Sequence, residues 1–146
     1  RKYLSDFSIE ELYELLQLRS EVFVVEQDCV YQDIDGKDQK ALHILGYKEG
    51  KLIAYTRIFR AGDYFNEASF GRVVVAASER QFGYGHDLIK ETIAAAKEEF
   101  NETIIRISAQ CYLTGFYESH GFKQEGEEYL EDGIPHIGMR RSVKTE

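Results

Sequence analysis

Hydrophobic and polar residues near the start of the chain follow a helical period. Ser8-Ile9-Glu10-Glu11 has the form of a capping box, in which a serine and a glutamate satisfy free N–H groups where a helix begins. The helix is predicted to run to about Phe23, because its apolar positions form one stripe: Leu12, Leu15, Leu16, Val22 and Phe23. Arg19 lies on the same stripe, so this cation is expected to need a partner. Before the helix, residues 2–4 are predicted as a short strand.

Residues 26–40 show no clear period and are rich in acidic side chains: Glu26, Asp28, Asp33, Asp35 and Asp38. We predict an irregular acidic loop over or beside an active cleft. After it, segments 42–47 and 52–59 flank Lys48-Glu49-Gly50-Lys51, whose residues favour a turn. These two segments are therefore predicted to form a hairpin of antiparallel strands.

The second half of the chain alternates strands with helices. Residues 69–75 are predicted as a strand, and the helix that follows a glycine-containing loop has one apolar face: Leu88, Ile89, Thr92, Ile93 and Ala96. A strand over 103–108 and a short helix over 113–120 come next, and strands over 123–130 and 134–143 form a final hairpin. This order predicts one α/β domain, residues 1–146, around a mixed, mostly antiparallel sheet.

The composition argues against several classes of function. The 146 residues include 26 acidic and 18 basic side chains, and the net charge of −8 opposes nucleic-acid binding, which depends on neutralising phosphates. No apolar run approaches the roughly 20 residues of a membrane-spanning helix. Cys29 and Cys111 lack Cys-x-x-Cys spacing, and the four histidines show no metal-ligand spacing. We therefore expect a cytoplasmic protein with reduced thiols and no metal, nucleic acid or membrane partner; monomer and homodimer both stay open.

The segment Arg80-Gln81-Phe82-Gly83-Tyr84-Gly85-His86 joins the strand 69–75 to a helix. The first N–H groups of a helix lack intrahelical partners and carry about half a positive charge, so they hold phosphate well. The two glycines allow close approach of the backbone, and the arginine adds a permanent cation. Neither the P-loop pattern nor the dinucleotide-binding pattern fits this segment. The segment is therefore a pyrophosphate site or, alternatively, a plain turn.

A second motif, Phe116-Tyr117-Glu118-Ser119-His120-Gly121-Phe122, follows about thirty residues after the Arg-x-x-Gly-x-Gly of residues 80–85. In order and spacing, the two motifs resemble the acetyl-CoA signature of the GCN5-related N-acetyltransferases (GNAT). More narrowly, four segments resemble the ElaA-type branch of this family: residues 22–27, 31–36, 43–46 and 132–139. The resemblance covers nearly the whole chain.

The resemblance implies how the cosubstrate acetyl-CoA binds. In this family the strands that correspond to residues 69–75 and 103–108 run parallel and splay apart, and the pantetheine arm lies between them. Backbone groups of Val73 and Val75 would bind the pantetheine amides, and an N–H near Val75 would polarise the thioester carbonyl. The implied cofactor-binding residues are Val73, Val74, Val75, Arg80, Gln81, Phe82, Gly83, Tyr84, Gly85, His86 and Gln110. Gln110 stands where many members have an asparagine.

The resemblance also assigns catalytic roles. Tyr117 corresponds to the family's general acid, which protonates the departing thiolate; its alternative is a core tyrosine. The acceptor amine must be neutral to attack, which costs roughly 4–5 kcal/mol for a lysine-like amine at neutral pH. Glu26 and His43 are the predicted bases, because one lies in the acidic loop and the other is of the residue type that titrates near neutral pH. Some members have a glutamate base where this chain has Gly71 and Arg72, which leaves the identity of the base open.

Arg57 and Arg72 lie in predicted strands among apolar neighbours, where a guanidinium needs an anion. Each pairs either with a carboxylate of the acidic loop or with a carboxylate of the substrate. We expect a structural ion pair for Arg57 and a substrate-facing position for Arg72. Asp35 and His136 complete the predicted substrate-binding residues, together with these two arginines.

The predicted function is transfer of an acetyl group from acetyl-CoA to a primary amine of a small molecule, by direct attack in a ternary complex. One alternative is an acyl-homoserine-lactone synthase, which the order of Arg19, Phe23, Asp35 and Arg57 resembles. Those enzymes are longer, lack the Arg-x-x-Gly-x-Gly segment and typically have a tryptophan near this loop, whereas this chain has no tryptophan. The other alternative is a non-catalytic acyl-CoA-binding module.

Overall fold

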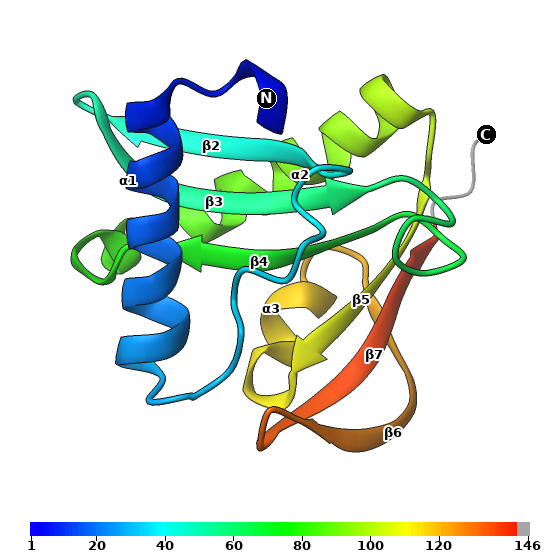
Figure 1. Ribbon diagram of the computed structural model, residues 1–146. Coiled ribbons are helices and arrows are strands. Elements are labelled where there is room, and N and C mark those ends of the chain that lie inside the picture. Colours follow the sequence, from blue (N-terminus) through cyan, green and yellow to red (C-terminus); the bar gives the residue numbers. More distant parts are fainter. Residues whose placement is uncertain (143–146) are drawn as a thin grey trace.

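The computed structural model of the protein describes residues 1–142, which form two antiparallel sheets (Figure 1). The first sheet has the order β1-β2-β3-β4 and the second has the order β5-β7-β6. The strands are β1 (Lys2–Tyr3), β2 (Leu42–Lys48), β3 (Lys51–Phe59), β4 (Ser69–Val75), β5 (Ile104–Gln110), β6 (Lys123–Glu131) and β7 (Ile134–Ser142). The predicted hairpins 42–59 and 123–143 are confirmed as β2–β3 and β6–β7, while Val143 lies outside the described residues.

The two sheets meet at the beginnings of β4 and β5. Ala68 and Ile105 form a parallel bridge there, and the N–H of Arg106 donates to the carbonyl of Ala68 at 2.8 Å. Within residues 1–142 no other bridge joins the two sheets, and β4 and β5 diverge from this point toward their C-terminal ends (Figure 1). The expected parallel, splayed arrangement of β4 and β5 is therefore confirmed. Because the two strands separate, the structure has two sheets where the sequence predicted one.

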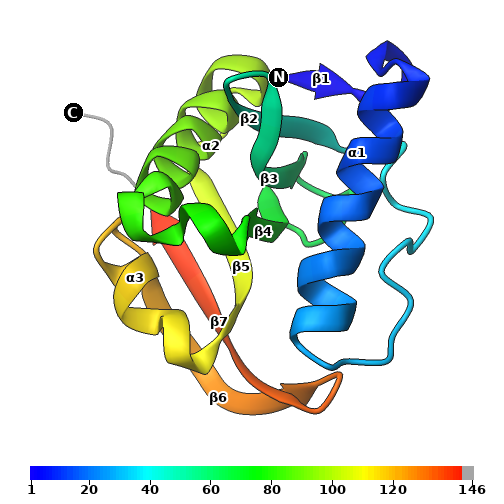
Figure 2. The same ribbon diagram turned by 90° about the vertical axis from the view of Figure 1, so that its left-hand side faces the viewer.

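The helices α1 (Ile9–Arg19) and α2 (Tyr84–Phe100) cover opposite faces of the first sheet (Figure 2). The predicted capping box is present, because Ser8 Oγ accepts from the N–H of Glu11 at 3.1 Å and Glu11 Oε1 accepts from the N–H of Ser8 at 2.9 Å. The α-helix ends at Arg19, four residues before the predicted end, and continues as a π-helical segment, η2 (Ser20–Glu26). A π turn holds one more residue than an α turn, so side chains beyond Arg19 are rotated relative to an α-helical register.

Two apolar clusters hold these layers together. One cluster packs α2 and the second sheet against the first sheet and includes Ile89, Ile105 and Met139, all buried. The other packs α1 and η2 onto the opposite face through Leu15 and Val22, among others. Both clusters include residues of the strands that border the gap, Phe70 and Ile107 in the first and Val74 in the second, so core packing holds β4 and β5 in their diverging positions. None of the helices within residues 1–142 is long and apolar enough to cross a membrane.

Three of the remaining short elements follow the C-terminal ends of β4 and β5: η3 (Ala77–Phe82) comes after β4, and η4 (Cys111–Leu113) and α3 (Thr114–Glu118) come after β5. The fourth, η1 (Leu4–Asp6), lies between β1 and α1. The predicted strand 103–108 extends two residues further, to Gln110, and the predicted helix 113–120 is divided into η4 and α3.

Candidate active site

Two cavities open where β4 and β5 diverge. The loop-side cavity is lined by Val73, Val74, Val75, Arg80, Gly85, Phe116 and others from η2 and η4. The hairpin-side cavity is lined by Arg72, Ser108, Glu131, Asp132, His136 and a set of aromatic side chains that includes Tyr31, Phe59, Tyr64, Phe65 and Phe70. The two cavities share six residues: Phe23, Gln27, Val73, Gln110, Leu113 and Tyr117. They therefore meet at a common wall.

The glycine segment forms the outer end of the loop-side cavity. Gly83 has a φ of +75°, a left-handed conformation that favours glycine, and it caps the 17-residue helix α2. Gly85 has no such constraint, and it faces the cavity beside the ring of Phe116. The free N–H groups at the start of α2 thus lie beside β4, as the sequence predicts for an anion site.

Arg80 is held in place beside this helix start. Its Nε donates to the carbonyl of Val75 at 3.0 Å, and its two Nη atoms lie 2.6 and 3.0 Å from the carboxylate oxygens of Glu26. Glu26 is exposed and lines the loop-side cavity, but it does not line the hairpin-side cavity. The structure therefore brings Glu26 to the end of the cleft where α2 begins, beside Arg80.

The other residues of the segment lie around its outside. Gln81 and Phe82 are exposed, and Tyr84 packs against Phe82 with ring centroids 5.7 Å apart. The ring of His86 packs against Phe116, and its Nδ1 forms a hydrogen bond with Nε2 of His120 at 2.8 Å. None of these four lines the loop-side cavity as the described residues shape it.

Replacing Gly85 with valine is expected to weaken CoA binding at least tenfold and leave folding intact. A Cβ at this position lies 3.5 Å from two ring atoms of Phe116, an ordinary contact, while the added methyl groups narrow the cavity. Calorimetric titration of CoA into the variant measures the effect, and thermal unfolding provides the check on folding. Gly83→Val is the poorer test, because a left-handed φ costs a valine about 1–2 kcal/mol by itself. Unchanged CoA affinity in Gly85→Val would remove the phosphate-loop assignment.

Tyr117 stands at the wall that the two cavities share. It comes from α3, is 5% exposed and packs among the rings of Phe70, Phe116 and Phe122. Burial raises the pKa of its hydroxyl well above the ordinary tyrosine value, so the group stays protonated at neutral pH. Within residues 1–142 its hydroxyl has no hydrogen-bond partner, although it lines both cavities. A protonated donor is thus available to a ligand at the junction.

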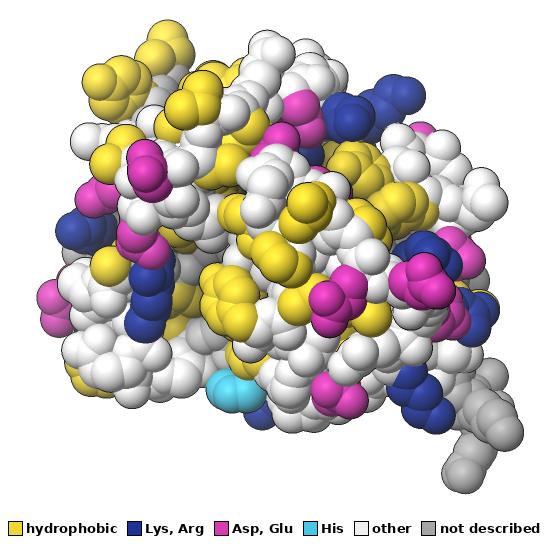
Figure 3. Space-filling model, turned by 90° about the horizontal axis from the view of Figure 1, so that it is seen from below, with side chains coloured by type: hydrophobic (Ala, Val, Ile, Leu, Met, Phe, Trp, Pro, Cys, Tyr) yellow, Lys and Arg dark blue, Asp and Glu magenta, His cyan; other side chains and the backbone are white. Residues whose placement is uncertain are grey.

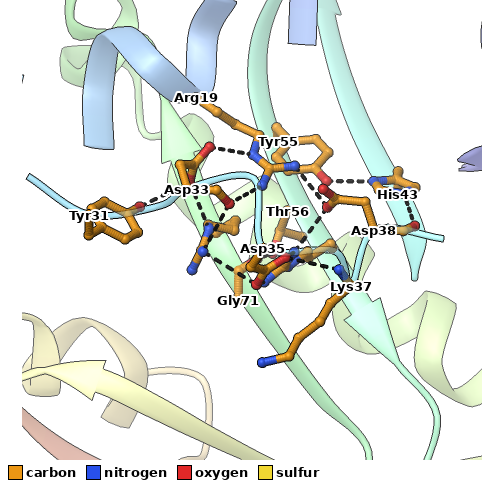
Figure 4. A network of polar contacts seen from close by, with 12 residues as sticks. Arg19, Tyr31, Asp33, Asp35, Lys37, Asp38, His43, Tyr55, Thr56 and Gly71 are labelled. Atoms are coloured by element: carbon orange, nitrogen blue, oxygen red, sulfur yellow. Dashed lines mark hydrogen bonds and ion pairs between the residues drawn. The ribbon is translucent and has the colours of Figure 1, made fainter. Parts of the chain in front are cut away.

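The acidic loop is held by three arginines rather than by solvent (Figure 4). Arg19, which is completely buried, donates to Asp33 Oδ2 at 3.0 Å and to Asp38 Oδ1 at 2.8 Å. Arg57 donates to Asp35 Oδ2 at 2.6 Å and to Asp38 Oδ1 at 3.0 Å. The predicted need of Arg19 for a partner and the structural ion pair of Arg57 are therefore present in the structure. Arg57 and Asp35 line neither cavity.

Arg72 both pairs with the acidic loop and faces a cavity, the two positions that the sequence left open for it. Its Nε lies 2.8 Å from Asp33 Oδ1, at an angle too poor for a hydrogen bond, and its Nη2 donates to the carbonyl of Asp33 at 3.1 Å. The side chain is nevertheless 20% exposed and lines the hairpin-side cavity. Its backbone has a φ of +54°, which is uncommon for arginine and often accompanies functional sites.

The two histidines among the predicted bases and substrate-binding residues lie in different surroundings. His43 is completely buried between β1 and β3: its Nε2–H donates to the carbonyl of Asp38 at 2.9 Å and its Nδ1 accepts from the hydroxyl of Tyr55. Burial lowers its pKa, and it lines neither cavity. His136 instead lies on the wall of the hairpin-side cavity, opposite Gln110 in the β5–β7 pairing.

Sequence reasoning missed the residues that the β6–β7 hairpin adds to this wall. Glu131 and Asp132 line the cavity, and Glu131 Oε2 lies 3.3 Å from His136 Nε2. In the sequence they are ordinary turn residues. Only the register that places His136 beside Gln110 brings them to the cleft.

The lower face of the molecule carries the ends of several elements that line the cavities (Figure 3). Hydrophobic side chains gather over its middle, acidic side chains lie among them, and Lys and Arg lie toward the edges. Four exposed apolar residues come from the elements near the cleft: Val25, Val30, Tyr112 and Leu130. The surface near the cleft therefore includes exposed apolar side chains.

Comparison with known proteins places the chain in a family. The model of an acetyltransferase (GNAT) domain matches residues 3–143. The ElaA protein of Escherichia coli K12 is 45% identical over 141 residues, covering 95% of this chain and 92% of that protein, and the crystal structure of Escherichia coli ElaA gives a TM-score of 0.87. An acyl-CoA N-acyltransferase from Pseudomonas aeruginosa is 43% identical, with a TM-score of 0.90 and coverage of 97% of both chains.

More distant structures share the fold alone. A CoA-dependent acyl-homoserine lactone synthase has a TM-score of 0.74 at 11% identity, over 91% of this chain and 76% of that one. With a family model over nearly all of its length and ElaA relatives at 45% identity, the chain belongs to the GNAT acetyltransferase family, in its ElaA-like branch.

Proposed function

We propose that the protein is an acetyl-CoA-dependent N-acetyltransferase that acetylates a primary amine of a small molecule in a ternary complex. The observation that carries this proposal is the position of Tyr117, whose side chain belongs to both cavities. One cavity ends at a helix start suited to a pyrophosphate, and the other is a separate pocket that suits a small acceptor. Direct transfer needs these two substrates side by side with a proton donor at their junction.

In this proposal, acetyl-CoA occupies the loop-side cavity. The pyrophosphate lies at the start of α2 near Gly83 and Gly85, and the pantetheine arm follows the backbone of Val73 and Val75. The relative from Pseudomonas aeruginosa, named as an acyl-CoA N-acyltransferase, supports an acyl-CoA donor. Gln81, Phe82, Tyr84 and His86 would then contact the outer, nucleotide part of the cofactor, because they surround the helix start. Gln110, on the shared wall, would contact the inner part.

Glu26 and His43 are less suited to the role of base than their sequence context predicts. Glu26 binds Arg80 at 2.6 Å, so its position fits the orientation of this arginine toward the phosphates. His43 holds the acidic loop through the carbonyl of Asp38, away from both cavities. We therefore propose positioning roles for both residues. Arg57 and Asp35 act likewise, as a partly buried pair that fixes the loop behind Arg72.

The chemical roles follow from the described geometry. A backbone N–H at the end of β4 polarises the thioester carbonyl, and the amine attacks from the hairpin-side cavity. Tyr117 then donates its proton to the departing thiolate. Burial raises the pKa of Tyr117, but a thiolate in the same dry cleft is destabilised as well, so the transfer stays close to balanced.

The proposal is tested by incubating the protein with acetyl-CoA and a panel of primary amines and reading the release of free thiol. We expect amine-dependent release, with loss of the acetyl group from CoA and its appearance on the amine by mass spectrometry. Tight CoA binding without thiol release from any amine would favour the non-catalytic acyl-CoA-binding module. Lactone formation from S-adenosylmethionine and an acyl-CoA would favour the lactone synthase.

A further inference from the structure

The ionisable side chains on the wall of the hairpin-side cavity leave a net negative charge. The basic and acidic side chains on this wall are Arg72, His136, Glu131 and Asp132. Arg72 belongs to the network of the acidic loop, in which three arginines face three aspartates: Arg19, Arg57 and Arg72 with Asp33, Asp35 and Asp38. The charge of Arg72 is thus already matched, whereas the two carboxylates of the hairpin have no Lys or Arg partner within residues 1–142.

His136, a largely buried side chain, lies on the same wall beside these carboxylates. Its side chain is 8% exposed, and its Nδ1 lies 2.7 Å from the carbonyl of Ile134, to which it donates. The neutral imidazole therefore carries its lone pair on Nε2. This atom makes no hydrogen bond within residues 1–142, lies 3.3 Å from Glu131 Oε2 and belongs to the cavity wall. A ring nitrogen with an open lone pair on a cavity wall, with a carboxylate beside it, is arranged to accept a proton.

Neighbouring groups fix the imidazole in this orientation. The ring of Tyr129 stacks on His136, with centroids 6.2 Å apart and planes 26° from parallel. The hydroxyl of Tyr129 in turn bonds to Ser108 on β5. His136 is therefore held from both sides, by the hairpin and by β5.

We propose, on the basis of the proposed function, that the acceptor is a cationic primary amine, bound by Glu131 and Asp132 and deprotonated by His136. The ammonium gives one proton to His136 Nε2, and Glu131 stabilises the resulting imidazolium. The neutral amine forms a C–N bond to the thioester carbon, and the C–S bond breaks as the thiolate takes the proton of Tyr117. The second amine proton returns to Tyr117, and His136 releases the first to solvent, so one proton leaves per turnover.

The aromatic part of the wall adds to this specificity. Tyr64 and Phe65 pack edge to face with centroids 4.9 Å apart, and both line the cavity with Phe59 and Phe70. Aromatic faces attract cations and apolar carbon alike. Arylalkylamines such as benzylamine are therefore suitable probes.

The test compares ligands that differ in charge. Benzylamine, a cation at neutral pH, is expected to bind the CoA-saturated protein at least tenfold more tightly than benzyl alcohol. Glu131→Gln and Asp132→Asn should each weaken the binding of benzylamine roughly fivefold and raise the KM for it, while the affinity for benzyl alcohol stays unchanged. Glu127 is an exposed acidic residue of the same hairpin, and Glu127→Gln is the matched control. It should change neither the affinity for benzylamine nor the affinity for benzyl alcohol. No preference for the cation, including no binding of either ligand, would overturn the proposed recognition.

The role of His136 is tested with amines of different basicity. His136→Gln should lower kcat/KM for benzylamine about 10²-fold, but for aniline, which is neutral at neutral pH, less than about threefold. Equal losses for both amines would reduce His136 to a packing residue. If the wild type releases no thiol with any amine, the proposed enzymatic function fails, while the binding comparison still decides whether the wall selects cations.

Discussion

Replacing Tyr117 with phenylalanine is expected to lower turnover roughly 10²–10³-fold, the range for loss of one positioned general acid. Phenylalanine keeps the ring that packs among Phe70, Phe116 and Phe122, so the fold and the affinity for CoA should change little. Thiol release under saturating substrates measures the loss. Tyr13→Phe, which removes the hydroxyl of an exposed tyrosine on α1, is the control and should keep full activity.

The dependence of kcat on pH in the wild type provides a second observation about Tyr117. Because burial raises the pKa of Tyr117 far above the ordinary value, the hydroxyl remains protonated across the range in which the folded enzyme is assayed. The kcat of the wild type should therefore show no decrease from tyrosine ionisation up to about pH 10. A tyrosine with an ordinary pKa would ionise near that pH, and kcat would then fall. Full turnover in a correctly folded Tyr117→Phe protein would show that the thiolate leaves unassisted or through another donor.

Features of the site that depend on local rules could be predicted from the sequence. The capping box at Ser8, the glycine-containing loop before α2 and the position of Tyr117 after Phe116 each follow from a few adjacent residues. The family resemblance adds the parallel, splayed strands, which periodicity alone does not contain. These features locate the proposed cofactor side of the cleft and its junction with the proposed acceptor side.

The proposed acceptor side depends on contacts between distant segments, which local sequence patterns do not describe. His43 and His136 are both strand histidines, and nothing adjacent to either shows that one faces the core and the other a cavity. The difference comes from pairing, since His43 lies opposite Arg57 within the first sheet and His136 opposite Gln110 at the cleft. A register of this kind is set by packing across the whole sheet.

The acidic loop illustrates the same limit. Its aspartates lack periodicity and look solvated, yet Asp33 and Asp38 are buried against arginines from α1, β3 and β4. The apolar surroundings of Arg19 and Arg57 in the sequence indicated that each needs an anion, and for Arg57 a carboxylate of this loop was one of the expected partners. Which aspartate meets which arginine depends on how the loop folds back over the sheet, which no local rule describes.

Replacing Arg19 with methionine is expected to destabilise the protein by about 3–5 kcal/mol, because the buried carboxylates of Asp33 and Asp38 each lose one of their two arginine partners. Arg19 is completely buried and makes three hydrogen bonds, two to the carboxylates of Asp33 and Asp38 and one to the carbonyl of Asp33. Chemical denaturation at neutral pH measures the change in the free energy of unfolding. Arg106→Met, which breaks the partly exposed pair with Glu125, is the matched control and should stay within about 1 kcal/mol.

The destabilisation by Arg19→Met should shrink as the pH falls, and this dependence separates an ionic network from simple packing. Burial by itself raises the pKa of Asp38, but the charges and hydrogen bonds of Arg19 and Arg57 hold it below its usual range; those of Arg57 do the same for Asp35. A carboxyl whose pKa is lower in the folded protein contributes stability above its unfolded pKa of about 3.9, and this stability is lost as the pH falls through the folded pKa. The wild type should therefore lose stability below about pH 4. In the variant Asp38 has lost one of its two cations, so its folded pKa rises and less of its stability remains to be lost. A cost of Arg19→Met that stayed constant from pH 7 to pH 3 would mean that the arginine acts through its volume rather than its charge.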